Sequence, residues 1–245
     1  MTRLRFYLKA IKNIIKLFLN IEINNKQKQN DKCKTLKIVE NGSGLPLVIS
    51  FGGLGGEFNF VNTLSDRKVN VVFLADVKHN WYLKGLIDVG NSVNEVAGFL
   101  GEIISRLNPS KTITIGVSAG GFGALLYGCL LNAEEIIAFS PQTFMNKSKI
   151  VRNFDFRWLD RVQEIYTRNK KNRVYFDLNK IVRNNKNCRA TIYYDVTHRL
   201  DTIHARNLKL SGVDLIKCKG GGHNLVKDLR AKGELIDIID NVLFE

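Results

Sequence analysis

Short apolar runs alternate with amphipathic segments along the chain from residue 35 onward. Six runs have the length and composition of buried strands, namely residues 45–51, 69–76, 111–117, 134–141, 189–195 and 213–218. Helical spacing of apolar residues marks 93–107, 121–131 and 224–244, the last containing Gly233 as a candidate break. This alternation predicts a three-layer α/β fold, in which helices cover both faces of a mostly parallel sheet.

The first 34 residues follow a different pattern, that of a basic amphipathic helix and a polar linker. Apolar residues recur at helical spacing between Leu4 and Phe18. The other side of this helix carries a basic stripe made of Arg5, Lys9, Lys12 and Lys16. Lysines interrupt the apolar run, no small-residue cleavage site follows it, and no run is long enough to span a bilayer. We expect residues 1–23 to lie on an anionic membrane surface or in the groove of a partner or, alternatively, to pack on the main domain formed by residues 35–245.

The charge of the chain is strongly positive and unevenly distributed. The formal net charge is +14, and basic residues outnumber acidic ones chiefly in residues 1–40 and 142–186. Such segments favour a negatively charged partner, whether phosphate, anionic lipid or acidic polymer. Since no recognised nucleic-acid motif accompanies the charge, nucleic acid is not the expected partner.

The four cysteines indicate neither a metal site nor a disulfide framework. They are Cys33, Cys129, Cys188 and Cys218, which lie far apart in the sequence and form no CxxC pair. Cys129 and Cys218 lie in apolar segments, which is typical of reduced, buried thiols. We therefore expect a cytoplasmic protein without a metal or bound cofactor.

The stretch "IGVSAGGFG" (115–123) contains the strongest chemical signal. Residues 116–120 form a complete G-x-S-x-G motif, between a predicted strand and a predicted helix. At such a turn a serine is held in a strained conformation at the sheet edge, and small neighbours let strand and helix approach closely. A tight turn without chemistry is the alternative, but the context favours Ser118 as a nucleophile.

A histidine and a carboxylate follow Ser118 in the order that this kind of site needs. His223 stands in "GGGHN", after the last predicted strand and before the last helix, and is the candidate base. Asp195 and Asp201 both follow the fifth predicted strand. We favour Asp201 as the acid, because a residue in the loop can reach sideways to the imidazole, whereas Asp195 closes the strand itself.

An oxyanion hole is the remaining requirement for acyl transfer. The backbone N–H of Ala119, directly after the nucleophile, is one expected donor. The loop "GGLGG" (52–56), after the first predicted strand, supplies the second, and we expect it at Gly53, with Leu54 as the alternative. This loop matches neither of the common glycine-rich phosphate-binding patterns.

Four short motifs carry a resemblance to a known family: "SAGGFGALLYG" at 118–128, "SPQ" at 140–142, "LDTIH" at 200–204 and "GGGHN" at 220–224. On these residues the chain resembles α/β-hydrolase-fold serine enzymes over residues 45–243. Within them it resembles the O-acetyltransferases of bacterial capsule biosynthesis more than the common lipases. The resemblance implies a Ser118–Asp201–His223 triad and independently favours Asp201, through the D-x-x-H spacing to His204.

In that fold, residues 142–186 occupy the usual place of a lid over the active site. Their basic residues suit an acidic polysaccharide or the phosphates of coenzyme A, and we expect Arg168, Lys170 and Lys171 to contact substrate. The alternative is a solvated helix face without a ligand.

The expected activity is acyl transfer through an acyl-serine, with acetyl-CoA as a possible donor. A capsular polysaccharide is the expected acceptor or ester substrate, at the inner face of the membrane. A general carboxylesterase would use the same residues, since it differs only in whether the acceptor is water. A third reading is a non-catalytic hydrolase-fold partner in assembly or secretion.

Overall fold

A single twisted sheet forms the centre of the molecule. The computed structural model describes residues 8–15, 35–168, 171–185 and 187–244. The sheet has seven strands in the order β1-β3-β2-β4-β5-β6-β7, all parallel except β1, which pairs antiparallel with β3. The strands are β1 (Leu36–Val39), β2 (Leu47–Phe51), β3 (Asn70–Leu74), β4 (Thr112–Val117), β5 (Glu135–Phe139), β6 (Arg189–Asp195) and β7 (Asp214–Cys218).

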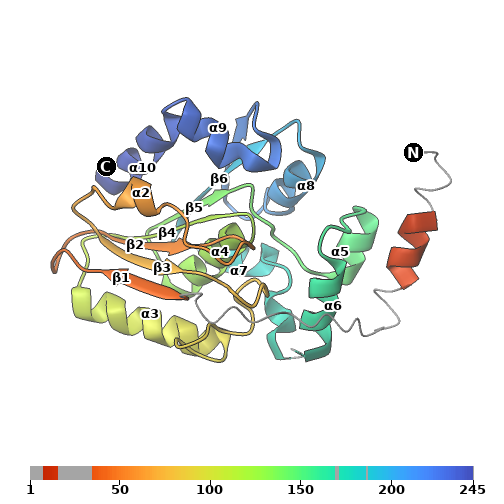
Figure 1. The fold of residues 1–245 in the computed structure, drawn as a ribbon, viewed down its shortest axis with the longest axis horizontal. Helices are drawn as coiled ribbons and strands as arrows, with labels where there is room; N and C mark the ends of the chain where they lie inside the picture. The colour runs from red at the N-terminus through yellow and green to blue at the C-terminus, as the bar shows by residue number, and fades with distance from the viewer. Residues whose placement is uncertain (1–7, 16–34, 169–170, 186, 245) are drawn as a thin grey trace.

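Helices cover both faces of the sheet (Figure 1). One face packs against α3 (Val93–Leu107), α4 (Ala119–Leu131), α7 (Asn179–Asn184) and α8 (Arg199–Asn207). The other packs against α2 (Val61–Leu64), α9 (Leu225–Ala231) and α10 (Glu234–Phe244). Each face therefore has its own apolar core, as expected for strands that are buried on both sides.

All six predicted strands are present, and the α/β fold predicted from the apolar pattern is confirmed. The additional strand, β1, is short and only half-buried at the edge of the sheet, so its pattern is weak. Gly233 does divide the C-terminal helix, because its φ of 80° separates α9 from α10.

The segment between β5 and β6 is largely helical. It contains α5 (Lys147–Arg152), α6 (Leu159–Arg168), a 3₁₀ turn at Lys171–Tyr175 and α7. Buried side chains from α5 and α6, among them Ile150, Val162 and Ile165, join the core on the α4 side of the sheet. The segment is thus packed onto the domain at a position beside the carboxyl ends of the strands (Figure 1).

Near the N-terminus, residues 8–15 form a helix with an exposed apolar side. Leu8, Ile11 and Ile15 are 56%, 53% and 47% exposed, whereas Ala10 is buried. The remainder of the predicted amphipathic helix and linker lies outside the described residues. Among the helices that are described, none combines the length and apolarity needed to cross a bilayer.

Candidate active site

Ser118 lies at a strained turn between β4 and α4. Its backbone adopts φ 55° and ψ −114°, a conformation that non-glycine residues rarely occupy. A Cβ at Gly116 would lie 2.1 Å from the carbonyl oxygen of Gly120, and a Cβ at Gly120 would lie 2.1 Å from that of Phe51. Only glycine fits at either position, so the two flanking glycines of the motif are required by the close approach of three backbone segments.

The turn is braced from the neighbouring strand. The N–H of Ser118 donates to the Phe139 carbonyl at 3.0 Å, and the N–H of Gln142 donates to the Ser118 carbonyl at 3.2 Å. The Gln142 side chain in turn accepts a hydrogen bond from the buried indole of Trp81. The "SPQ" motif after β5 therefore holds the serine turn in place.

Three side chains that are remote in sequence form one hydrogen-bonded chain. His223 Nε2 lies 3.0 Å from Ser118 Oγ, and His223 Nδ1 lies 2.9 Å and 3.0 Å from the two carboxylate oxygens of Asp201. The structure thus brings together the three residues predicted as nucleophile, base and acid. Because the carboxylate accepts from Nδ1–H, Nε2 is left as an acceptor for the serine proton.

Asp201 lies in the first turn of α8 rather than in the loop before it. The helix begins at Arg199, and His198 is its N-cap. The Asp201 side chain is 1% exposed, and the same Oδ1 is approached by His198 Nδ1 at 3.0 Å and by the guanidinium of Arg157 at 3.7 Å. Burial raises the pKa of the Asp201 carboxyl, but the His223 hydrogen bond and the charges of His223 and His198 outweigh it and hold that pKa below its ordinary value.

Asp195, the alternative acid, has a different task. It ends β6, is 1% exposed, and accepts hydrogen bonds at 3.1 Å and 2.8 Å from the N–H groups of Gly220 and Gly222. Its other oxygen accepts from the Thr197 N–H and hydroxyl. Asp195 therefore fixes the glycine loop that carries His223, and its carboxylate is occupied by backbone donors.

The two predicted oxyanion donors come from neighbouring loops. Ala119 is the first residue of α4, where backbone N–H groups have no partner within the helix. Gly53 follows β2, and a Cβ placed on it would lie 3.6 Å from the Val117 carbonyl oxygen, so this loop runs close to the serine turn. Both residues therefore lie beside Ser118, and their role as donors stays a prediction.

A second buried histidine–carboxylate pair ties the segment between β5 and β6 to α8. His204 is 1% exposed; its Nδ1 accepts from the N–H of Thr143 at 3.0 Å, so its Nε2 donates to Asp155 Oδ2 at 2.9 Å. Asp155 also accepts two hydrogen bonds from Arg157, at 2.7 Å and 2.9 Å. Arg157 thereby connects Asp155 with Asp201, the carboxylate of the Ser118–His223 chain.

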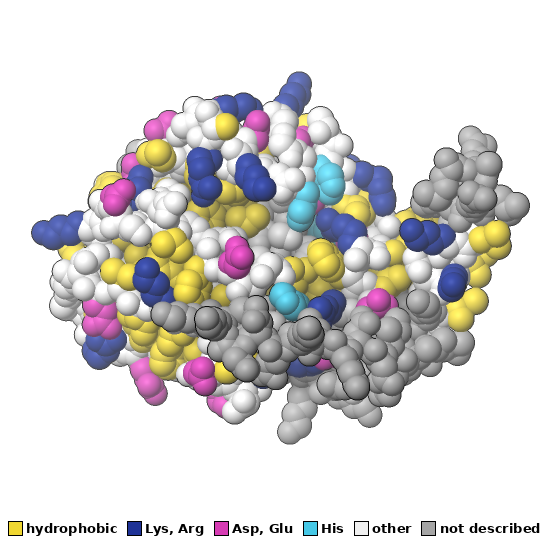
Figure 2. All heavy atoms as spheres, viewed as in Figure 1, with side chains coloured by type: hydrophobic (Ala, Val, Ile, Leu, Met, Phe, Trp, Pro, Cys, Tyr) yellow, Lys and Arg dark blue, Asp and Glu magenta, His cyan; other side chains and the backbone are white. Residues whose placement is uncertain are grey.

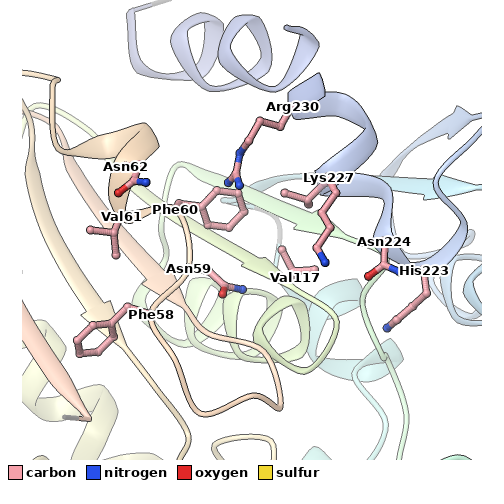
Figure 3. A pocket seen from close by; sticks show the side chains of 11 residues that line it. Phe58, Asn59, Phe60, Val61, Asn62, Val117, His223, Asn224, Lys227 and Arg230 are labelled. Atoms are coloured by element: carbon pink, nitrogen blue, oxygen red, sulfur yellow. The ribbon is translucent and has the colours of Figure 1, made fainter. Parts of the chain in front are cut away.

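An open cavity of about 340 Å³ adjoins His223 and Val117, the residue that precedes Ser118. It lies between the loop that leads into α2 and the helix α9 (Figure 3). Val117 and His223 line its inner side, while Lys227 and Arg230 reach into it from α9. Figure 2 shows this hollow as an apolar surface with basic side chains along one edge and histidines beside it.

The three predicted substrate contacts in the basic segment 142–186 cannot be placed at the level of their side chains. Lys170 lies outside the described residues, as do the side chains of Arg168 and Lys171. Sequence reasoning missed Arg157 as a partner of Asp201, and it missed Lys227 and Arg230. The last two stand one helical turn apart directly after the histidine motif, a spacing that could have signalled a shared face.

One group of described residues has the donor atoms for a metal ion. His198, Asp201 and His223 offer ligand atoms that all lie within 4.8 Å of one another. Two of these three residues belong to the hydrogen-bonded chain with Ser118, in which their donor and acceptor atoms are already used. The arrangement therefore fits proton transfer better than metal binding.

Comparison with known proteins rests on structure, since no family model and no curated protein matches the chain. The capsule O-acetyltransferase of Neisseria meningitidis serogroup A superposes with a TM-score of 0.60 at 16% identity, covering 93% of this chain and 99% of that one. An α/β hydrolase enzyme from the metagenome of lagoon sediments at Mar Chica, Morocco, gives 0.53 at 19% identity, covering 88% and 100%. A lipase-esterase related protein from Clostridium acetobutylicum gives 0.54 at 17% identity, covering 85% and 99%.

The chain has the α/β-hydrolase fold. The fold expected from the four motifs is therefore confirmed over nearly the whole length of the solved relatives. In an α/β-hydrolase fold, the carboxyl ends of the parallel strands form the edge where ligands bind. Ser118 after β4, Asp201 after β6 and His223 after β7 all lie at this edge.

Proposed function

We propose that this protein is a serine-dependent acyltransferase or esterase, with Ser118 as nucleophile, His223 as general base and acid, and Asp201 as the orienting carboxylate. The observation that carries the proposal is the continuous hydrogen-bonded chain from Ser118 Oγ through His223 to Asp201 at a strained serine turn. A serine hydroxyl is a weak nucleophile unless such a base accepts its proton.

The reaction proceeds in two steps that use the same residues. His223 Nε2 takes the proton of Ser118 as Oγ attacks the carbonyl carbon of an ester or thioester, and the protonated histidine gives that proton to the leaving group. An acyl-serine forms. His223 then takes the proton of the acceptor hydroxyl as this attacks the acyl-serine, and it gives that proton to Ser118 Oγ as the acyl–Oγ bond breaks. In both steps the N–H groups of Ala119 and Gly53 hold the negative charge on the carbonyl oxygen.

For the substrates, we propose O-acetyl transfer to, or ester hydrolysis on, an acidic bacterial surface polysaccharide, with acetyl-CoA as the acyl donor. The net charge of +14 supports an anionic substrate. The structural likeness to a capsule O-acetyltransferase, one structure of which was solved in complex with CoA, supports the same class. The basic segment 142–186, including Arg168, Lys170 and Lys171, would act as the lid of the domain formed by residues 35–245.

We further propose that residues 1–23 place the enzyme on the inner face of the membrane. The exposed Leu8, Ile11 and Ile15 occupy successive turns of one helix, and Lys9 and Lys12 are exposed beside them. An exposed apolar side with neighbouring lysines suits the boundary between lipid headgroups and acyl chains.

The decisive experiment is labelling with a fluorophosphonate probe, followed by mapping of the adduct. We expect one adduct on Ser118 and none in Ser118→Ala, whose melting temperature should stay close to that of the wild type. The absence of an adduct would favour a non-catalytic role for the fold. Incubation with radiolabelled acetyl-CoA, with and without an acidic glycan, then separates the two activities: label in the glycan indicates transfer, and free acetate alone indicates hydrolysis.

A further inference from the structure

The cavity beside His223 has two chemically different walls. Phe58 and Phe60, from the loop before α2, form an apolar wall together with Val117 at the end of β4. The opposite wall is α9, from which Arg230 points toward Phe60 and Lys227 points toward Val117 (Figure 3). The walls come from distant parts of the sequence and meet only because α2 and α9 cover the same face of the sheet.

The positive charge in this cavity is not neutralised by the surrounding protein. No carboxylate is among the described residues that line it. Neither Lys227 nor Arg230 has an ion-pair partner in the described part of the chain, although Lys232 on the same helical segment pairs with Asp228 at 2.7 Å. Since residues three apart in a helix lie on one face, the two cations act on the same volume.

A cavity with unpaired cations on one wall and apolar side chains on the other favours ligands that carry both an anionic and an apolar group. Two cations at a concave site raise the local concentration of anions and pair with them, and the low-dielectric wall strengthens this attraction. Arginine and lysine both bind carboxylate and phosphate oxygens through charge-assisted hydrogen bonds. A cavity of about 340 Å³ is large enough for part of a substrate that carries one such group.

We infer that this cavity is an anion subsite: it binds a portion of the substrate that bears a phosphate or carboxylate, which Lys227 and Arg230 pair with while its apolar part lies against Phe58 and Phe60. The inference rests on the proposed function, because the cavity opens onto His223. It assigns the recognition of the substrate's anionic group to Lys227 and Arg230 on α9 rather than to the basic residues of the segment between β5 and β6. The anion belongs either to the acyl donor, as a phosphate, or to the acceptor, as an acidic sugar.

The test compares two esters that differ only in charge, 4-acetoxybenzoate and its methyl ester. In Lys227→Gln/Arg230→Gln, the ratio of kcat/KM for the anionic ester to that for the neutral ester should fall about tenfold at low salt, and the difference should narrow as salt rises. The matched control is Lys68→Gln/Lys209→Gln, which removes the same charge from two exposed positions away from the cavity and should leave the ratio unchanged. An unchanged ratio in the first variant overturns the inference.

A measurement of anion binding tests the subsite without relying on catalytic turnover. Calorimetric titration of Ser118→Ala, with and without the two α9 substitutions, uses CoA in one arm and a sialic acid trimer in the other. Loss of CoA binding assigns the subsite to the donor, and loss of trimer binding assigns it to the acceptor. Equal binding with and without the substitutions, or no binding in either arm, overturns the subsite. If neither ester is turned over while an anion still binds through Lys227 and Arg230, the proposed function fails and the subsite stands.

Discussion

His198 Nδ1 lies 3.0 Å from Asp201 Oδ1, the oxygen that His223 Nδ1 approaches at 2.9 Å. Two imidazoles therefore compete for one carboxylate oxygen, and their ring centroids are 5.6 Å apart. His198 Nδ1 also accepts a hydrogen bond from the N–H of Asp201 at 3.3 Å, so His198 is the N-cap of α8.

From this capping contact we predict that His198→Ala and His198→Asn differ in stability. Asparagine keeps an oxygen that can accept from the N–H of Asp201, whereas alanine removes the cap, which costs about 1 kcal/mol. His198→Ala should therefore melt at a lower temperature than the wild type, and His198→Asn close to it. Thermal unfolding measures the difference, and equal melting temperatures for the two variants would mean that the cap does not contribute to stability.

Asp201→Asn and Asp195→Asn should differ sharply in activity. Loss of the Asp201 charge leaves the wrong imidazole tautomer and an unstabilised imidazolium, so kcat should fall on the order of thousands-fold. Asp195→Asn loosens the loop that carries His223 and should mainly lower the melting temperature. The kcat on a small ester and the melting temperature are measured for both variants. A larger loss of kcat in Asp195→Asn than in Asp201→Asn would exchange the roles of the two carboxylates.

The buried pair of Asp155 and His204 should make the fold sensitive to acid. Burial raises the pKa of the Asp155 carboxyl, but the hydrogen bonds from Arg157 and His204 outweigh it and hold that pKa well below its ordinary value. Burial lowers the pKa of His204. In both cases the unfolded chain binds more protons, so stability is full above the unfolded pKa values and declines as pH falls, first below that of histidine and then below that of aspartate.

Asp155→Asn tests this linkage. The variant should be less stable than the wild type at pH 7, and its free energy of unfolding should fall less steeply between pH 4 and 2. Urea unfolding at a series of pH values gives both quantities. Parallel pH profiles for the two proteins would show that Asp155 is not a source of the acid sensitivity.

Deletion of residues 1–23 should abolish binding to vesicles that contain anionic lipid. Each basic residue near such a surface contributes about 1 kcal/mol of attraction, which salt weakens. Sedimentation with phosphatidylglycerol vesicles measures binding, and phosphatidylcholine vesicles are the control. Turnover of a soluble ester should persist in the truncated protein; if it unfolds instead, these residues belong to the core.

Local patterns determined what the sequence could predict. Ser118 and its glycines are adjacent in the chain, so the nine residues 115–123 are enough to predict the strained turn and the strand and helix on either side of it. Asp201 was harder to place, because the choice between it and Asp195 depends on which backbone donors each carboxylate meets, and these come from the loop at Gly220 and Gly222. The sequence offered no sign of β1, since an edge strand with one partner needs little apolar character.

The anion subsite and the Arg157 contact show where such prediction ends. Phe60 and Lys227 stand in separate stretches of the chain, and only the shared sheet face brings them together. The same holds for Arg157 and Asp201, which belong to different segments on either side of β6. Charge counts identified a basic protein without revealing which cations lack partners, because pairing is a property of the folded surface.

Arg157 also links two properties that an engineer would want to vary separately: the size of substrate that the segment between β5 and β6 admits, and the support of the Asp201 carboxylate. Its guanidinium is held by Asp155 in the segment between β5 and β6, and it lies 3.7 Å from the carboxylate of Asp201, which His223 also contacts. Displacing this segment from α8 would therefore withdraw a positive charge from the buried Asp201 carboxylate. An enzyme engineered to admit a bulkier substrate on this side should thus also lose part of the support for Asp201, and we expect its kcat to fall even on a small ester.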